Sequence, residues 1–249
     1  MAESSNTRSP LAGETEVRSR TLVVTAHPDD VDYGAAGAVA RWVAEGEDVR
    51  YCVVTDGDSG HSDLALPKAE VAAARRTEQQ AAARAVGVRH VDFLGLPDGR
   101  LTPSPALRRC LTRVLRTHRP HRVVTHSPVR QIDRIRASHP DHLAVGEALF
   151  SAVYPDARNP RAFPELAAGG LDPWRVAEIW VMTGRDSNTY VDITATLDAK
   201  CAALRCHASQ HADPEALDAD VRRWAATIAR AGRLPEGRYA ESFRVVSAD

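Results

Sequence analysis

Two short stretches of the chain carry histidine and aspartate at spacings that could bind a metal ion. The first, HPDD at 27–30, directly follows an apolar run. The second, SHPDH at 138–142, places His139 and His142 three residues apart, the spacing that separates His27 from Asp30. Three residues is a distance at which two side chains can reach one centre on a tight turn or at a helix start.

Aspartates that lie this close repel each other, and they lose solvation if they sit in a cleft. Capping of a helix would explain one carboxylate of the first stretch but neither the second carboxylate nor the histidine. A lone HxxH is weak on its own, because ten histidines make such a spacing common by chance. Together the two stretches offer imidazoles and carboxylates, and two histidines with one aspartate around an open fourth position are a familiar catalytic zinc arrangement. A divalent cation would also offset the repulsion between the carboxylates.

The elements that carry these stretches are predicted from hydrophobic pattern. Short Val-rich runs of the kind that form strands covered on both faces lie at 21–26, 49–55, 88–94 and 121–126. Helical patterns lie between them at 34–46, 68–86 and 104–118, and Gly87 is a plausible end for the second. The alternation predicts an α/β fold: a Rossmann-like, doubly wound, mostly parallel sheet with helices on both faces.

The two histidine stretches fall where such a fold binds ligands, at the carboxyl ends of its strands. Further strands are expected at 177–184, 189–194 and 239–246, the last as an edge strand, with helices beginning near 142, 197 and 214. The Pro- and Gly-rich segment 154–174 is long for a compact domain, so it is a candidate lid or substrate-facing loop.

Bulk composition narrows the class of protein. We expect a disordered N-terminal tail over 1–20 and a single domain over 21–249, since no linker divides the chain. A formal net charge of -1 gives no reason to expect nucleic acid as a partner. No apolar run is long enough to span a membrane, the N-terminal stretch lacks a signal-peptide pattern, and the four cysteines form no CxxC pair, which favours a cytoplasmic location.

The paired motifs resemble the LmbE/PIG-L family of zinc-dependent de-N-acetylases. AHPDD after the first strand and HPDH later carry the similarity. Further matches extend it over about Leu22 to Gln210, and they are RRTEQQAAARAVGV, DFLGLPDGRL, YPDARNPRAFPEL, YVDIT and KCAALRCHASQ. One departure is Val31, where the family frequently has Glu, which puts any role for a glutamate there in doubt.

The resemblance implies a role for each residue of the two motifs. His27, Asp30 and His142 would hold zinc, or another divalent ion, and Asp29 would be the general base for the attacking water. His139 would stabilise the oxyanion as an imidazolium or protonate the leaving amine. This set suits amide hydrolysis, which needs a strong nucleophile, charge stabilisation on the tetrahedral oxygen and a proton for the amine.

Three further residues are weaker candidates for substrate binding. Arg75 matches a family R-x-x-E helix and could hold a sugar hydroxyl, although an Arg–Glu pair on a helix is usually a surface contact. Asp98 lies in LPDG, where turn chemistry is the commoner explanation. His207, in HASQ, matches a family position near the pocket rim and is as readily explained as a helix-end histidine.

The predicted function is therefore a metal-dependent hydrolase that removes an acyl group, acetyl in the first instance, from a small N-acyl amino sugar or glucosaminyl conjugate. One alternative is an amidase that cleaves a larger thiol-sugar conjugate or a glycopeptide amide. Another is a non-catalytic sugar- or nucleotide-binding relative, which the acids in the first turn and the lack of GxGxxG disfavour. The sequence is also compatible with a homo-oligomer.

Overall fold

The computed structural model describes residues 19–132, 135, 138–182 and 186–249. The tail expected over 1–20 lies outside the described residues as far as residue 18, and the first strand begins at Arg20.

A seven-stranded mixed sheet forms the centre of the described chain. Its order is β3-β2-β1-β4-β5-β7-β6, and every pairing from β3 through β5 is parallel. β7 runs antiparallel to both of its neighbours. The strands are β1 (Arg20–Thr25), β2 (Asp48–Thr55), β3 (His90–Leu96), β4 (Arg122–Thr125), β5 (Glu178–Met182), β6 (Thr189–Asp192) and β7 (Ala240–Ser247).

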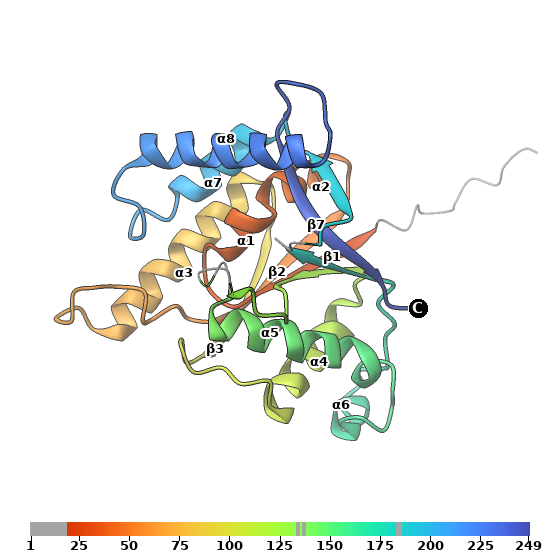
Figure 1. Cartoon of the computed structure of the whole chain (residues 1–249). Helices are drawn as coiled ribbons and strands as arrows, with labels where there is room; N and C mark the ends of the chain where they lie inside the picture. Colours follow the sequence, from red (N-terminus) through yellow and green to blue (C-terminus); the bar gives the residue numbers. More distant parts are fainter. Residues whose placement is uncertain (1–18, 133–134, 136–137, 183–185) are drawn as a thin grey trace, which may run out of the picture.

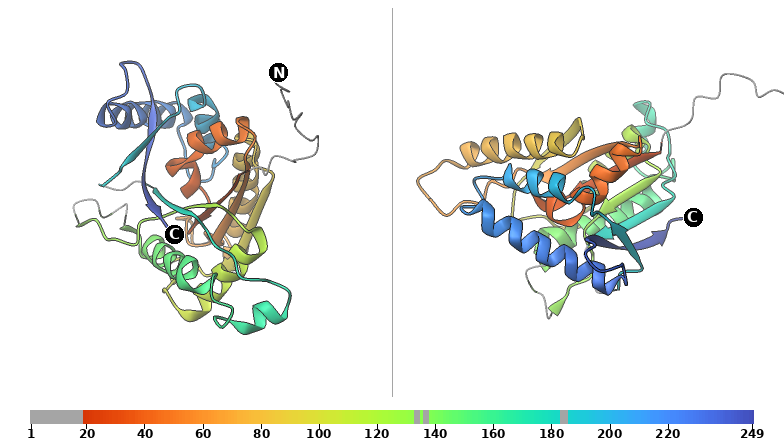
Figure 2. Two further views of the ribbon diagram at one scale, coloured as in Figure 1. Left: turned by 90° about the vertical axis from the view of Figure 1, so that its right-hand side faces the viewer. Right: turned by 90° about the horizontal axis from the view of Figure 1, so that it is seen from above.

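Helices cover both faces of this sheet, as the sequence predicts (Figures 1 and 2). One face carries α1 (Asp30–Gly34), α2 (Ala36–Ala44), α3 (Lys68–Ala85), α7 (Leu197–Arg205) and α8 (Pro214–Ala231). The other carries α4 (Pro105–His118), α5 (Pro140–Ser151) and the short π-helix at Ala152–Asp156, with α6 (Pro164–Ala168) beyond them. None of the helices in the described ranges is long and apolar enough to cross a membrane.

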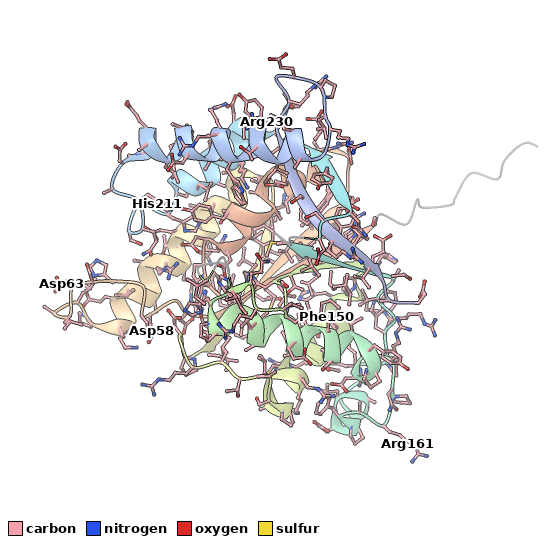
Figure 3. The ribbon with its side chains drawn as sticks, in the orientation of Figure 1. Asp58, Asp63, Phe150, Arg161, His211 and Arg230 are labelled. Carbon is pink, nitrogen blue, oxygen red and sulfur yellow. The ribbon has the colours of Figure 1, made fainter. Side chains whose placement is uncertain are left out.

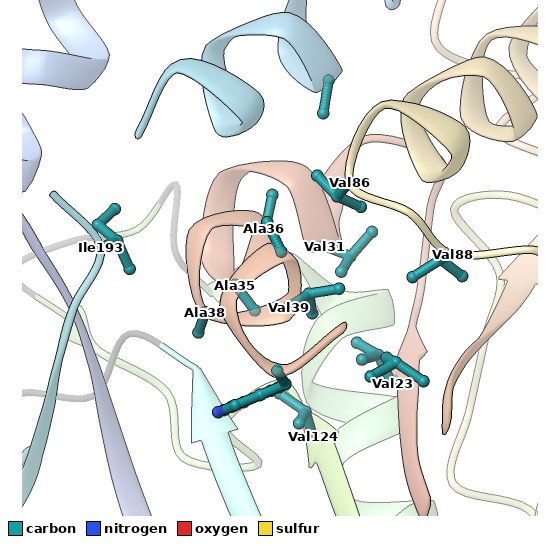
Figure 4. Packing of buried hydrophobic residues seen from close by; sticks show 14 of the residues in the cluster. Val23, Val31, Ala35, Ala36, Ala38, Val39, Val86, Val88, Val124 and Ile193 are labelled. Atoms are coloured by element: carbon teal, nitrogen blue, oxygen red, sulfur yellow. The ribbon is translucent and has the colours of Figure 1, made fainter. Parts of the chain in front are cut away.

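The strand alternation sorts side chains into two apolar cores. In β1, Val23 packs into the core under α1 and α2, while Leu22 and Val24 pack into the core under α4 and α5. Figure 4 shows the first core, in which Val31 and the alanines of α2 lie close to the sheet. Close approach explains the small residues, since a Cβ on Gly37 would lie 2.7 Å from the Ile193 side chain.

The helix predicted over 34–46 is confirmed as α2, and the short helix α1, which was not predicted, precedes it across a break at Ala35. Ala35 has φ −148° and ψ 0°, which no α-helical residue adopts. The break leaves unpaired backbone groups on both sides, and these groups need partners. The apolar pattern of 34–46 therefore predicted α2 to within two residues at each end, but it did not reveal the short helix before the break.

A buried ion pair supplies those partners. Lys200 Nζ, on α7, donates to the carbonyl oxygens of Asp32 (3.0 Å) and Tyr33 (2.6 Å) in α1, and it lies 2.6 Å from Glu241 Oε1. The Glu241 carboxylate accepts the backbone N–H groups of Gly37 and Ala38 at the start of α2. The cation therefore pairs with carbonyl groups of α1 and the anion pairs with N–H groups of α2, which holds the two helices together at the break.

Two expectations need correction. The last strand is not at the edge: β7 inserts between β5 and β6, and β6 is the edge strand. Apolar alternation does not distinguish an edge strand from an inserted antiparallel one, because both bury one face.

The segment 154–174 is not a lid over the motifs. Its Trp174 indole donates to the carbonyl of Pro120, just before β4 begins, so the segment lies at the opposite end of the strands from HPDD. Arg116 holds it there with hydrogen bonds to the carbonyls of Asp156, Asn159 and Ala162. Figure 3 shows Arg161 far from Asp58 and His211.

The buried pair at the α1–α2 break should dominate the stability of this face. Removing one partner of a buried pair leaves an uncompensated charge, so Lys200→Met should lower the free energy of unfolding by about 3–5 kcal/mol in urea titrations. The chain's other lysine is the matched control: Lys68 pairs with Asp58 but is exposed, so Lys68→Met should cost less than about 1 kcal/mol. Equal losses would contradict this account.

Candidate active site

The two histidine motifs meet at the carboxyl ends of β1 and β4. His27 follows β1, and His142 lies in the first turn of α5. His27 Nδ1 is 3.2 Å from His142 Nε2 and 3.4 Å from Asp30 Oδ2, and His142 Nε2 is 3.0 Å from Asp30 Oδ1. Bonds of 2.0–2.2 Å to a tetrahedral zinc ion imply ligand separations of about 3.3–3.6 Å. The three separations, which involve both oxygens of Asp30, lie at or slightly below this range, so the donor atoms are close enough together to share one metal ion.

The charge of this cluster also fits a cation. Burial would lower the pKa of His27, but hydrogen bonds to the carboxylates of Asp141, Asp30 and Asp98 raise it to about 12. Conversely, burial would raise the pKa of Asp30, yet His142 and His126 hold it well below the ordinary value. The carboxylates thus keep an additional positive charge in place. A divalent cation can substitute for the proton that they otherwise hold on His27.

The far nitrogen of His27 is fixed by two carboxylates. His27 Nε2 lies 3.0 Å from Asp98 Oδ1 and 3.3 Å from Asp141 Oδ2. Asp141 is fully buried and accepts backbone N–H groups from Gly99 and Leu101, and it was not among the predicted site residues. A proton held on Nε2 leaves the lone pair of Nδ1 directed toward Asp30 and His142, which is the usual outer support of a metal-binding histidine.

His126 is a second residue that the sequence analysis did not single out. It directly follows β4, is buried, stacks on His142 with ring centroids 4.0 Å apart, and has Nε2 3.2 Å from Asp30 Oδ2. The same Nε2 accepts the backbone N–H of Ala26 (3.1 Å), which occupies its lone pair. Burial lowers the pKa of His126 to about 4. Its position at the end of a predicted strand was the only signal in the sequence.

Asp29 precedes Asp30 in the first motif and has its backbone in the left-handed region, at φ 86°. Its carboxylate is 3.0 Å from the Arg75 guanidinium, which also donates to the carbonyls of Pro28 and Gly57. Burial, together with the negative charge of Asp30, raises the pKa of Asp29 to about 7 despite Arg75. A carboxylate with this pKa is well matched to accept a proton near neutrality.

His139 lies at the N-cap of α5, and its ring is 4.8 Å from that of His27. Its Nδ1 accepts the backbone N–H of Asp141 at 3.2 Å, so the neutral ring carries its proton on Nε2. Burial and the positive charges of His27 and His142 lower the pKa of His139. The ring therefore offers an N–H donor next to the cluster.

The three residues predicted to bind substrate lie in different surroundings. Arg75 is buried, and its described contacts are to Asp29 and to backbone carbonyls. Asp98 contacts His27 and the backbone N–H of Ser59. His207 is fully buried and lies 2.8 Å from Asp32, which does not bring it to the surface of the site.

Comparison with known proteins identifies relatives over most of the chain. The family model described as GlcNAc-PI de-N-acetylase (PIG-L) matches residues 22–153. The diacetylchitobiose deacetylase of Thermococcus kodakarensis is 30% identical, over 91% of this chain and 83% of that protein. The 1D-myo-inositol 2-acetamido-2-deoxy-alpha-D-glucopyranoside deacetylase 2 of Saccharopolyspora erythraea is 32% identical, over 76% of this chain and 82% of that protein.

Solved structures share the fold. The N,N'-diacetylchitobiose deacetylase from Pyrococcus horikoshii, in complex with its inhibitor MPG, has a TM-score of 0.84 and 30% identity over 92% of this chain and 84% of that chain. GalB, the 4-carboxy-2-hydroxymuconate hydratase of Pseudomonas putida KT2440, has a TM-score of 0.76 and 25% identity over 92% of this chain and 96% of that chain. The same architecture thus occurs in deacetylases and in a hydratase.

The geometry separates metal ligands from their supports. After zinc loading and desalting, His142→Ala should lose stoichiometric zinc, because one of three donors is gone. His126→Ala should keep a stoichiometric ion with affinity reduced about 10- to 100-fold, as expected for a supporting residue. Elemental analysis of the two variants measures this directly. If zinc were retained in His142→Ala but lost in His126→Ala, the metal ligand would be His126 and the assignment of His142 would be wrong.

Proposed function

Because this chain belongs to the PIG-L family of de-N-acetylases, we propose that it is a metal-dependent hydrolase that removes the acetyl group from an N-acetylated amino sugar. The observation that supports this most is the set of donor atoms on His27, Asp30 and His142, 3.0–3.4 Å apart, with Asp29 directly before Asp30 in the first motif. Amide hydrolysis needs an activated water, a base and a hydrogen-bond donor for the tetrahedral oxygen, and these residue types supply them.

Zinc is the metal that we propose for the site, held by His27, Asp30 and His142. Two imidazoles and one carboxylate with an open fourth position are a common catalytic zinc set, although another divalent ion could take the same donors. A divalent ion bound there would lower the pKa of a water molecule towards about 7 and polarise the acetyl carbonyl.

Asp29 is the proposed general base. Arg75 holds its carboxylate on the side of the cluster, and a pKa raised to about 7 allows it to take a proton from the attacking water near neutral pH. When the carbon–nitrogen bond breaks, the leaving nitrogen needs a proton. The protonated Asp29 carboxyl then holds the proton that the amine requires.

His139 is the proposed donor to the developing oxyanion. Because Nδ1 accepts the Asp141 N–H, the ring presents Nε2–H without needing a second proton, which favours oxyanion stabilisation over delivery of a proton to the amine. Removal of one such donor typically costs about 10²–10³-fold in kcat.

The substrate class follows from what the relatives' names have in common. A 2-acetamido-2-deoxyglucosyl unit is present in diacetylchitobiose and in the inositol conjugate, so we propose this unit as the group recognised here. Contact of Arg75 and Asp98 with the sugar stays a prediction. A larger thiol-sugar conjugate or a glycopeptide amide is the alternative substrate, and a non-catalytic role is disfavoured because both motifs are intact.

Several broader features are proposals of the same kind. We propose that 21–249 forms one deacetylase domain, supported by a single sheet that takes strands from Arg20 through Ser247. A cytoplasmic location is supported by the four free cysteines, since disulfides are rare in that compartment. The small sugar conjugate is the proposed partner, with neither nucleic acid nor membrane, and a homo-oligomer is compatible with this assignment.

The function is tested by measuring amine release from N-acetylglucosamine, diacetylchitobiose and a glucosaminyl-inositol conjugate, with zinc and with a chelator. We expect release from at least one of them that the chelator abolishes and zinc restores. Asp29→Asn and His139→Asn should each retain zinc while kcat falls by about 10²-fold or more. Asn keeps an N-cap acceptor at 139, so loss of activity there reports on the imidazole and not on the helix start.

A wild-type chain that binds zinc but releases no amine from any of the three compounds would contradict the substrate class. Full activity in either variant would contradict the role given to that residue.

A further inference from the structure

A chain of buried polar side chains runs from α7 to the backbone of Asp29. Gln79, on α3, accepts the Asp29 N–H through Oε1 (2.8 Å) and donates through Nε2 to Asp32 Oδ2 (2.9 Å). His207 Nε2 donates to the same Asp32 oxygen at 2.8 Å. The helices α1 and α3 both pack against α7, which closes the chain within one face of the sheet (Figure 1).

Burial of these polar side chains is costly in free energy. Gln79, Asp32 and His207 are each 0% exposed, and Asp32 Oδ1 and His207 Nδ1 find no hydrogen-bond partner among the described residues. Apolar side chains of similar volume would fill the same space without that cost. Polar side chains in this position therefore need a reason beyond packing, and among the described residues their contact with the active site is the Asp29 backbone.

Asp29 needs to be held. A non-glycine residue at φ 86° is strained, and such a conformation persists only where its surroundings over-determine it. Arg75 fixes the carboxylate, and the Asp29 carbonyl accepts the N–H groups of Asp32 and Tyr33 as α1 begins. The remaining backbone group, the N–H, has Gln79 as its partner.

The amide of glutamine is the group that this position requires. Its neighbours are an N–H donor on one side and a carboxylate acceptor on the other, so the side chain must accept and donate at once. Glutamate could accept the N–H but would face Asp32 with a second negative charge. Methionine has the length of glutamine but can neither accept the Asp29 N–H nor donate to Asp32.

We propose that Gln79 is a positioning residue for Asp29: anchored through Asp32 and His207, its amide holds the left-handed backbone that directs the Asp29 carboxylate toward the metal-site donors. This inference rests on the proposed function, because it assigns Gln79 a part in that reaction. It also gives the buried His207 a role away from the substrate.

The test compares two adjacent glutamines on α3. Gln79→Met should bind stoichiometric zinc and keep KM within about twofold, while kcat falls about 10-fold or more. Gln80 is exposed on the same helix, so Gln80→Met should leave kcat, KM and zinc content unchanged. Gln79→Glu keeps the acceptor for the Asp29 N–H but loses the donor to Asp32 and places a second negative charge against it, so it should also lower kcat with zinc retained, and it serves as the second variant if Gln79→Met does not fold.

A double-mutant cycle separates positioning from a general structural role. If Gln79 acts through Asp29, Gln79→Met or Gln79→Glu added to Asp29→Asn should cause no further loss of kcat in single-turnover assays at high enzyme concentration. An equal loss in both backgrounds, or an unchanged kcat in the single variants, would overturn the proposal. An inactive wild-type chain would instead contradict the proposed function, so the two failures are distinguishable.

Discussion

Excess negative charge around one imidazole is the constraint on which the rest of this structure depends. His27 has the carboxylates of Asp30, Asp98 and Asp141 within 3.4 Å. Asp29 lies two residues after His27 in the sequence. Such a cluster is stable only with a compensating cation, either a proton on His27 or a metal ion between the donors. The chemistry proposed for the site begins with this requirement.

The surrounding fold supplies the geometry that the charge cluster cannot supply for itself. Parallel strands bring the carboxyl ends of β1 and β4 to one edge, where α5 starts and presents His142. The break between α1 and α2 is held by Lys200 and Glu241, and the turn before it is held by Arg75 and Gln79. Elements more than 100 residues apart therefore determine where a single carboxylate points.

Much of this could be predicted from the sequence, for physical reasons. A histidine and aspartate pair after an apolar run, repeated after a second run, has to converge if the strands are parallel, so His27, Asp30 and His142 were identifiable. The apolar pattern of 34–46 indicated α2 but not the short helix α1 or the break at Ala35, because the partners of the backbone groups at the break are a lysine and a glutamate distant in sequence. The antiparallel insertion of β7 was equally hidden, since its pattern suits either place in the sheet.

Single residues that belong to no repeated spacing were also hard to predict from the sequence. His126 and Gln79 act through contacts with residues far along the chain, and His126 is marked in the sequence only by its place at the end of a predicted strand. Asp141 lies inside the HPDH motif, but the motif does not reveal its contact with His27. His207 was noticed through a motif, and the sequence left open whether it lies at the pocket rim or is a helix-end histidine, because sequence does not tell which side of a helix end faces a ligand. Its contact with Asp32 appears only in three dimensions.

The central claim is that His27 Nδ1, Asp30 and His142 Nε2 enclose the metal. Anomalous diffraction at the zinc edge from crystals of the zinc-loaded protein tests it directly. The account predicts one strong peak about 2.0–2.2 Å from each of these three groups, with His126 outside the coordination sphere. A peak bound to His126, a peak between His27 Nε2, Asp98 and Asp141, or no peak in zinc-loaded crystals would contradict it.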